Sequence, residues 1–188
     1  MARPKSTDKR NAIMDAAVRV IVRQGLSAPT ATIAKEAGIS NGSLFTYFAT
    51  KDDLFNELYL EIKAEVAAAS LHDFPAEAAL RQQVLHVWTA SMEWGASNSD
   101  KRRALALLKV SDQITPKTQA AGFKLMAGFE TLIEQMRTGG SLRNAPKGFI
   151  PAVLNALAET TMDFMVKDPA HAKKHCTVGF ETFWRAVS

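Results

Sequence analysis

Several short or planar polar side chains in one stretch of the chain could together make hydrogen bonds to another molecule. They are Asn41, Ser43, Thr46 and Tyr47. Leu44 and Phe48 lie four residues apart in the same segment, so one face of a helix there packs inward and the polar groups largely point away from the core. Amide, hydroxyl and phenol groups on such a face suit a surface that reads base edges and contacts phosphates.

The sequence around these residues predicts two short helices separated by a glycine turn. Ile33 and Ala34 give the first helix a small apolar face, and Gly38 can adopt the left-handed conformation that ends a helix sharply. Ser40 is a good N-cap for the second helix, expected over residues 41–48, because its hydroxyl can accept a hydrogen bond from a free backbone N–H. This pattern is typical of a helix-turn-helix whose second helix enters the major groove of DNA.

The stretch from residue 30 to residue 54 resembles the N-terminal DNA-binding domain of the TetR family of transcriptional regulators. The family signature is approximately Ile-Ala, a spacer, Ala-Gly-Val/Ile-Ser, x-Gly-Ser/Thr-Leu-Tyr-x-Tyr/His-Phe and x-x-Lys-x-x-Leu. The sequence matches it without a gap at Ile33-Ala34, Ala37-Gly38-Ile39-Ser40, Gly42-Ser43-Leu44-Phe45, Tyr47-Phe48, Lys51 and Leu54. Such a long match is far more specific than a lone helix-turn-helix pattern.

The resemblance implies which residues contact DNA. The DNA backbone is expected to be held by the basic start of the first helix and by Thr30, Tyr47 and Lys51. Bases are expected to be read or touched by Asn41, Gly42, Ser43 and Thr46. Gly42 has no side chain, so it can only permit close approach of the backbone. Phe45 stands where the family usually has tyrosine, and two roles stay open for it: stacking on a sugar or thymine methyl group, or simple packing.

The division of charge along the chain supports a nucleic-acid partner. Residues 1–51 hold eight Lys or Arg against three Asp or Glu, a net charge of +5, whereas the remaining residues hold 15 against 16, a net charge of −1. A charge cluster taken alone is most often a solvated face. Its coincidence with the helix-turn-helix favours phosphate binding instead.

Composition limits the class of protein. The chain has 188 residues, of which 47% are hydrophobic and 22% charged, as in ordinary globular domains. Cys176 is the single cysteine, so no intramolecular disulfide can form and a reducing cytosol is expected. The N-terminus has no apolar segment of the signal-peptide type, and no apolar run approaches the length needed to span a bilayer. We therefore expect a cytoplasmic protein.

The periodicity of apolar residues predicts an all-α fold of about nine helices. The first helix is expected over residues 7–24, the second opens at residue 29 or 30, and a fourth, capped by Thr50, continues to about residue 70. Five more are expected over residues 76–97, over 100–113, through 123–136, from 151 through 165, and through 176–187. The resemblance implies a three-helix DNA-binding domain at residues 1–50 and a ligand-binding and dimerising helical domain at residues 51–188.

Aromatic and methionine side chains recur at helical spacing in the second domain. Such residues are usually core. The resemblance raises the alternative that some line an effector cavity, and the candidates are Trp88, Met92, Leu108, Phe123, Met126, Phe129, Met162 and Met165. No charged residue stands out within these stripes, so an apolar or aromatic effector is expected. The last two helices carry long apolar stripes that suit a four-helix dimer interface, with the candidates Leu154, Leu157, Phe180, Phe183 and Trp184.

Enzymatic and metal sites are disfavoured. His171 and His175 share one helix face, but two histidines near two lysines make a poor metal site, and a solvated face is favoured. No nucleophile elbow, phosphate-binding loop or telling acid–base pair occurs, so we expect no enzyme and no cofactor. The prediction is a regulator, in its simplest form a ligand-responsive repressor that binds a palindromic DNA operator as a homodimer. The alternatives are a DNA-binding regulator controlled by a protein partner, and a helical small-molecule carrier or enzyme.

Overall fold

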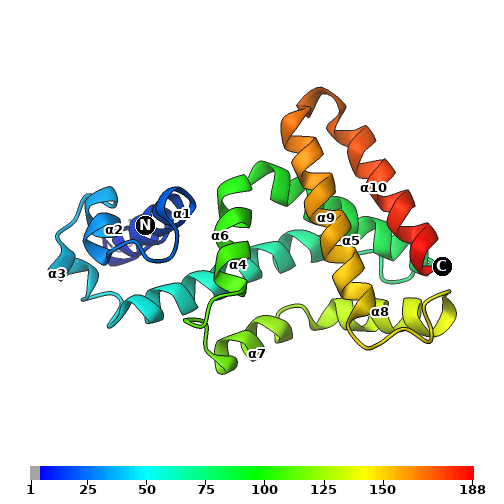
Figure 1. The fold of residues 1–188 in the computed structure, drawn as a ribbon, viewed down its shortest axis with the longest axis horizontal. Helices are drawn as coiled ribbons and strands as arrows, with labels where there is room; N and C mark the ends of the chain where they lie inside the picture. Colours follow the sequence, from blue (N-terminus) through cyan, green and yellow to red (C-terminus); the bar gives the residue numbers. More distant parts are fainter. Residues whose placement is uncertain (1–4) are drawn as a thin grey trace. The chain divides into compact units, whose positions relative to one another are not determined.

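The computed structural model describes the backbone of residues 5–188 and the side chains of residues 7–188 (Figure 1). Within that range it has ten α-helices, one 3-10 helix and no strand, which confirms the all-α expectation. The helices are α1 (Lys5–Gln24), α2 (Thr30–Glu36), α3 (Asn41–Leu44), α4 (Lys51–Leu71), α5 (Leu80–Ser97), α6 (Ser99–Lys109), α7 (Pro116–Lys124), α8 (Ala127–Gly139), α9 (Phe149–Lys167), η1 (Pro169–His171) and α10 (Ala172–Val187).

Four helices differ from the sequence-based expectation: α5 begins at Leu80 rather than at residue 76, α6 ends at Lys109 rather than at residue 113, and the other two differ as follows. The long helix expected through residues 123–136 is two helices, α7 and α8, because the backbone turns between them: the Met126 N–H donates to Phe123 O at 2.9 Å. The helix expected over 41–48 is regular only to Leu44, although the turns that follow keep helix-like bonds, such as Tyr47 N–H to Leu44 O at 3.0 Å. Neither break contains a proline. Gly122 and Gly128 flank the break between α7 and α8, but the apolar periodicity continues across both breaks.

Contacts divide the chain into two compact units. The first holds the described residues up to Lys63 together with residues 100–122, and the second holds residues 64–99 and 123–188. The helix pair α6–α7 thus belongs to the same unit as α1, α2, α3 and the first part of α4. The division at residues 50 and 51 remains a prediction, since these units are defined by packing and cut the chain elsewhere.

Glycine turns and caps shape the first unit. Gly25 and Gly38 have φ of +78° and +71°, a left-handed conformation that favours glycine and ends α1 and α2. Thr50 caps α4, as expected, because its Oγ1 accepts the Asp53 N–H at 3.0 Å. The core between the helices is built from apolar side chains at most 1% exposed, among them Ile13, Ile21, Ile33, Leu44, Phe48 and Leu54.

The second unit is organised around Trp88 of α5. Its ring stacks on Phe183 of α10 with centroids 5.9 Å apart and planes at 10°. Its Nε1–H donates to the backbone oxygen of Cys176 at 3.1 Å, so the one polar atom of the indole is satisfied in the core. Helices α9 and α10 pack along each other at Gly179, which is buried.

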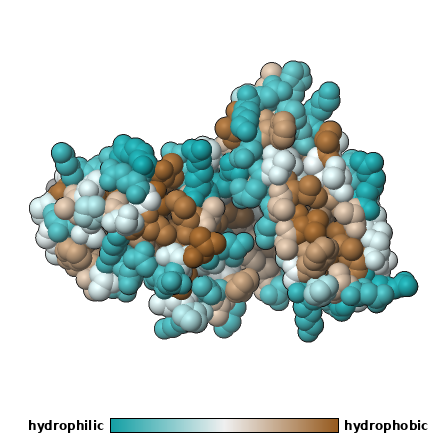
Figure 2. Space-filling view, in the orientation of Figure 1, coloured by the Kyte–Doolittle hydropathy of each residue, from teal (hydrophilic) through white to brown (hydrophobic). Residues whose placement is uncertain are grey.

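Helix α9 is unusually apolar for its exposure. The expectation that no apolar run approaches membrane-spanning length is wrong for this helix: by length and composition alone it is the one helix in the described range that could cross a membrane. Only 22% of its apolar window is buried in this chain. Figure 2 shows apolar surface gathered over this helix. A single helix of this kind is weak evidence for a membrane, and a second protein surface covers such a face equally well.

Candidate nucleic-acid interface

The segment from Ser40 to Phe48 presents polar groups on a buried apolar base. Leu44 and Phe48 are 0% and 1% exposed, which fixes the inward face. The residues turned to the surface are Asn41, Gly42, Phe45 and Thr46, and Ser43 and Tyr47 are half-buried. Phe45 is 42% exposed, so a large part of its ring is available to a partner, which favours the stacking role over simple packing. The division expected from helical spacing is therefore present in the fold.

Local hydrogen bonds hold this segment in shape. The Ser43 N–H donates to Ser40 Oγ at 3.1 Å, the N-cap bond that the sequence predicted. The two serine hydroxyls also bond to each other at 2.8 Å. Thr46 Oγ1–H donates to Ser43 O at 2.7 Å, so its oxygen remains free to accept. The hydroxyl groups are thus pre-positioned rather than freely rotating, which lowers the entropic cost of binding DNA.

Lys51 ties two parts of the first unit together. Its ammonium donates to the backbone oxygen of Leu26, in the turn between α1 and α2, at 2.6 Å. It also lies 5.3 Å from the centre of the Phe55 ring. A lysine ammonium has three donors, so one bond to Leu26 leaves it able to bind a phosphate as well. Sequence reasoning missed the tie to Leu26 because a backbone oxygen carries no signal in the sequence.

Part of the positive charge counted in residues 1–51 is paired within the unit. Arg19 and Arg23 of α1 both bind the carboxylate of Glu36, at 2.7 and 2.5 Å. Hydrogen bonds from Arg23 and then Arg19 hold the pKa of Glu36 below its usual value. Arg10 likewise makes ion pairs with two glutamates of α4. These arginines bond α1 to α2 and α4, so fewer cations of this unit are unpaired than the charge count alone indicates.

Two further lysines of the described residues lie at the surface of the first unit. Lys9 of α1 and Lys35 of α2 are exposed. Arg3 and the side chain of Lys5, which belong to the predicted basic start of the first helix, lie outside the described residues. The exposed lysines provide positive charge for phosphates beside the polar segment, in keeping with an electrostatic footprint for DNA.

Comparison with known proteins identifies the arrangement. The model of the family "bacterial regulatory proteins, tetR family" matches residues 13–58, which span the capped turn, the polar segment and Lys51. The chain belongs to the TetR family. Members of this family are DNA-binding transcriptional regulators, which are not enzymes. Both parts of the sequence-based resemblance, the fold and the DNA-binding class, are confirmed.

Three relatives illustrate the similarity. The chain is 28% identical over 107 residues to the HTH-type transcriptional regulator AcrR of Shigella flexneri, a match covering 54% of this chain but only 47%, about half, of AcrR. It is 27% identical to the HTH-type transcriptional regulator BetI of Agrobacterium fabrum, over 85% of this chain and 88% of BetI. The crystal structure of a TetR-family regulator from Shewanella sp. PV-4 superposes with a TM-score of 0.78 at 25% identity, covering 95% and 97% of the two chains.

Gly42 offers a direct test of the interface of this TetR-family chain. A Cβ atom added there would meet nothing within 4 Å, and its φ is not in the left-handed region, so Gly42→Ala is expected to leave thermal stability unchanged or slightly raised. Operator affinity is expected to fall about tenfold, because the added methyl group would stand between the helix backbone and the DNA. Wild-type affinity in this variant, measured by fluorescence anisotropy, would show that the backbone does not approach DNA at Gly42.

Most of the residues predicted to line an effector cavity are packed core. Their side chains fill the two units, leaving at most 8% exposed in Trp88, Met92, Leu108, Phe129, Met162 and Met165. Met126 is half-buried against the second core, and Phe123 is 62% exposed. The cavity role stays a prediction for this set, since tightly packed side chains must move before they can line a ligand.

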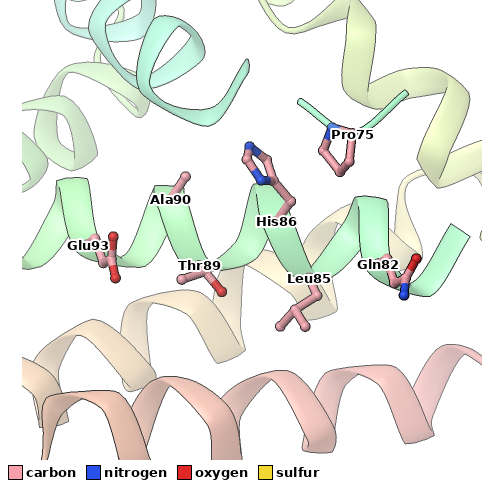
Figure 3. A pocket seen from close by; sticks show the side chains of 7 residues that line it. All are labelled: Pro75, Gln82, Leu85, His86, Thr89, Ala90 and Glu93. Carbon is pink, nitrogen blue, oxygen red and sulfur yellow. The ribbon is translucent and has the colours of Figure 1, made fainter. Parts of the chain in front are cut away.

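A surface hollow lies instead along α5 (Figure 3). It has a volume of about 420 Å³ and is lined by Pro75, Gln82, Leu85, His86, Thr89, Ala90 and Glu93. Figure 3 shows that every lining side chain except Pro75 projects from α5. The His86 ring is fixed by a 2.9 Å bond between Nε2 and the backbone oxygen of His72, at the end of α4. No sequence pattern indicated this hollow, because its lining residues are an ordinary mixture of polar and apolar types.

The residues predicted for the dimer interface fall into two groups. Phe180 and Phe183 are 1% and 0% exposed and pack inside their own chain, whereas the half-buried members are Leu154, Leu157 and Trp184. Exposed apolar side chains on α9 and α10 are different ones: Phe149, Phe164, Val166 and Val178, the last 56% exposed. An apolar stripe predicts burial but does not say whether the cover is the same chain or another.

The two histidines expected on one helix face lie in different elements, His171 in η1 and His175 in α10, and both bond a carboxylate. His171 Nδ1 and His175 Nε2 lie 2.9 and 3.0 Å from Asp168 Oδ2, between α9 and α10. Hydrogen bonds from His175 and then His171 hold the pKa of Asp168 below its usual value. No group of side chains suited to a metal ion occurs among residues 7–188.

Proposed function

We propose that this chain is a ligand-responsive repressor that binds a palindromic operator as a homodimer in the cytoplasm. The observation that carries the proposal is the exposed polar segment after Ser40, set on buried Leu44 and Phe48 and followed by Lys51. It combines rigid hydrogen-bonding groups with positive charge, the two requirements for reading bases and holding phosphates.

Each predicted DNA contact has a distinct task. The amide of Asn41 can donate and accept at a base edge, and the hydroxyl oxygens of Ser43 and Thr46 accept or donate according to the base. Phe45 contacts a thymine methyl group or a sugar through its exposed ring. Phosphates on either side are held by Thr30, Tyr47 and Lys51. In this arrangement the phosphate contacts fix the position of the protein along the DNA, and residues 41–46 recognise the base sequence.

The apolar surface of α9 and α10 supplies the dimer contact. Phe164 is 54% exposed and its ring lies 5.6 Å from that of His175, so α9 and α10 present one joined surface. Val178 on α10 is 56% exposed. Two copies of such a face can form a four-helix interface, and a twofold dimer presents two recognition segments to the two halves of a palindrome.

Val178→Lys is expected to convert the dimer to monomers, because two lysines facing each other across a twofold interface repel and lose their hydration. Sedimentation velocity measures the change. The matched control is Val110→Lys, which alters another exposed valine, 81% exposed in the first unit, and is expected to leave the dimer intact. A dimer of Val178→Lys with wild-type affinity would place the interface elsewhere.

A small ligand is the proposed signal. The hollow along α5 has a volume within the usual range of ligand sites, and its lining mixes apolar groups with hydrogen-bonding ones. Its His86 is bonded to the end of α4, so a ligand there contacts a residue joined to the helix that follows the DNA-binding segment. A ligand can shift DNA binding only by the difference in its affinity for two conformations. The effector can be apolar or aromatic, as the sequence predicts.

Selection from a random DNA pool with the purified full-length protein tests the proposal. We expect enrichment of an inverted repeat whose half-sites lie about one helical turn apart, bound with a steep dependence on salt. Enrichment of a single, non-repeated site would contradict the dimer model. Failure to retain any DNA at low salt would overturn the assignment and favour a small-molecule carrier or enzyme.

A further inference from the structure

Both polar atoms of the Asn56 side-chain amide, in the second turn of α4, make hydrogen bonds. Its Nδ2 donates to Asp52 O at 2.7 Å and to Gln113 O at 2.8 Å. Its Oδ1 accepts the Thr115 N–H at 3.0 Å. Two of these partners lie in the loop between α6 and α7, residues 110–115, which we call the α6–α7 corner. One side chain thus bonds the corner to the start of α4.

The corner returns a second bond to the same helix. Gln113 Nε2 donates to the Asp52 carboxylate, Oδ1, at 2.8 Å. The pair Asp52–Gln113 and the amide of Asn56 therefore form a closed set of contacts between two segments about sixty residues apart in sequence. Such a set costs conformational entropy to assemble, and it persists only if all its groups are satisfied together.

Close packing further along α4 reinforces the attachment. A Cβ atom added at Gly122 of α7 would lie 2.7 Å from Tyr59 Cε1, so the two helices approach as closely as glycine allows. Lys63 Nζ donates to Gly122 O at 3.4 Å. Burial, followed by the nearby charge of Lys109, lowers the pKa of Lys63. Contacts with α7 therefore continue along α4 beyond the corner.

The opposite side of the same turns is attached to the DNA-binding helices. Lys51 binds the backbone of Leu26, and Arg10 of α1 binds Glu57 and Glu61 at 2.8 and 2.9 Å. Residues of one short stretch of α4 thus alternate between partners in α1 or its following turn and partners in the α6–α7 corner. All of these groups belong to the first compact unit.

We propose that Asn56 is a positioning residue for operator binding, an inference that rests on the proposed function. It does not contact DNA, because its three hydrogen bonds are spent on α4 and on the corner. Its task is to hold the first turns of α4, and through Lys51 the turn after α1, in the arrangement that DNA requires. Without these bonds the first turns of α4 and the turn after α1 become ordered only when DNA binds. The entropic cost of that ordering lowers the affinity for the operator.

Asn56→Ala in the full-length protein tests the inference on the selected operator. We expect affinity for the operator to fall about tenfold. The slope of affinity against salt concentration and the affinity for unrelated DNA are expected to stay unchanged, because no phosphate contact is removed. Asn98→Ala is the matched control: the Asn98 amide makes the corresponding bond to Trp94 O of its own helix, at 2.9 Å, but lies in the other unit.

Hydrogen exchange at Thr115 separates positioning from general stability. Its N–H is held by Asn56 Oδ1, so operator binding is expected to slow its exchange in the wild type and to have no effect on it in Asn56→Ala. If Asn56→Ala does not fold, Gln113→Ala replaces it as the test, because this variant removes only the side-chain bond to Asp52. A two- to threefold loss of operator affinity is expected.

The outcomes are distinct. The inference is overturned if Asn56→Ala binds the operator with wild-type affinity. If Asn56→Ala does not fold, wild-type operator affinity in Gln113→Ala overturns it instead. Either result leaves the proposed function standing. A loss accompanied by a flatter salt slope shows direct DNA contact and also overturns the inference. Failure of the wild-type protein to select any DNA contradicts the proposed function itself.

Discussion

Replacing Lys51 and Tyr47 together by alanine is expected to weaken operator binding at least about a hundredfold. Both side chains are predicted to hold phosphates, and a dimer loses each contact twice. Removal of two lysine–phosphate contacts per dimer is expected to reduce the slope of log affinity against log salt by about 2. Fluorescence anisotropy with labelled operator over a salt series measures both quantities.

The double variant needs controls because Lys51 also has a structural bond. Loss of its donation to Leu26 O loosens the turn after α1, so thermal unfolding must be measured alongside binding. Tyr47→Phe removes only the phenol hydroxyl and isolates its phosphate contact. Lys124→Ala, at an exposed site in α7, removes a positive charge far along the sequence from the DNA-binding segment. Unchanged affinity and unchanged salt slope in the double variant would remove the DNA-binding segment from the proposed interface.

The local features of this site could be predicted because their physics lies within a few residues. Ser40 is followed by the N–H that it caps, and Gly38 ends α2 with φ of +71°. Leu44 and Phe48 face inward because of helical spacing alone. Each inference needed only a residue type and its immediate neighbours.

Contacts between distant segments could not be predicted in this way. Lys51 reaches a backbone oxygen, and any residue in place of Leu26 would offer the same acceptor. Asn56 bonds the backbone of the α6–α7 corner, which apolar periodicity places only as a loop. The break between α7 and α8 likewise contains no proline, and the apolar periodicity continues across it although Gly122 and Gly128 lie on either side. Tertiary packing determines these contacts and this break, and the residue type at any one position does not reveal them.

Apolar stripes were the most ambiguous signal. Phe183 and Val178 both lie on α10, yet one is 0% and the other 56% exposed. For Trp88 the spacing favoured packed core and left a cavity wall as the alternative, and in the structure its ring stacks on Phe183. Periodicity identifies a face that avoids water, whereas the chain's own packing determines what covers it.

The tightest contact between α9 and α10 lies at Gly179. A Cβ atom there would stand 2.1 Å from Thr161 Oγ1 and 2.9 Å from Trp88 Cζ2, well inside van der Waals contact. Thr161 is 6% and Trp88 2% exposed, so neither side chain can swing into solvent to make room. Glycine is therefore required by the approach of the two helices, although its position in a helix costs backbone entropy.

Gly179→Ala is expected to lower the free energy of unfolding by about 3 kcal/mol, because one methyl group overpacks a closed core and must separate α9 from α10. Thermal or urea unfolding monitored by circular dichroism measures the loss. The matched control is Gly139→Ala, at the end of α8, where a Cβ atom would meet nothing within 4 Å. That variant is expected to be neutral or more stable by up to about 1 kcal/mol.

The same substitution separates the packing of the second unit from DNA reading. Since α9 and α10 carry the proposed dimer surface, Gly179→Ala is expected to weaken dimerisation as well as folding, and operator affinity through the dimer. The first unit contains none of these contacts, so its binding to unrelated DNA is expected to persist wherever the protein remains folded. Wild-type stability in Gly179→Ala would mean that the two helices are free to move apart, and the proposed interface would then lack a rigid base.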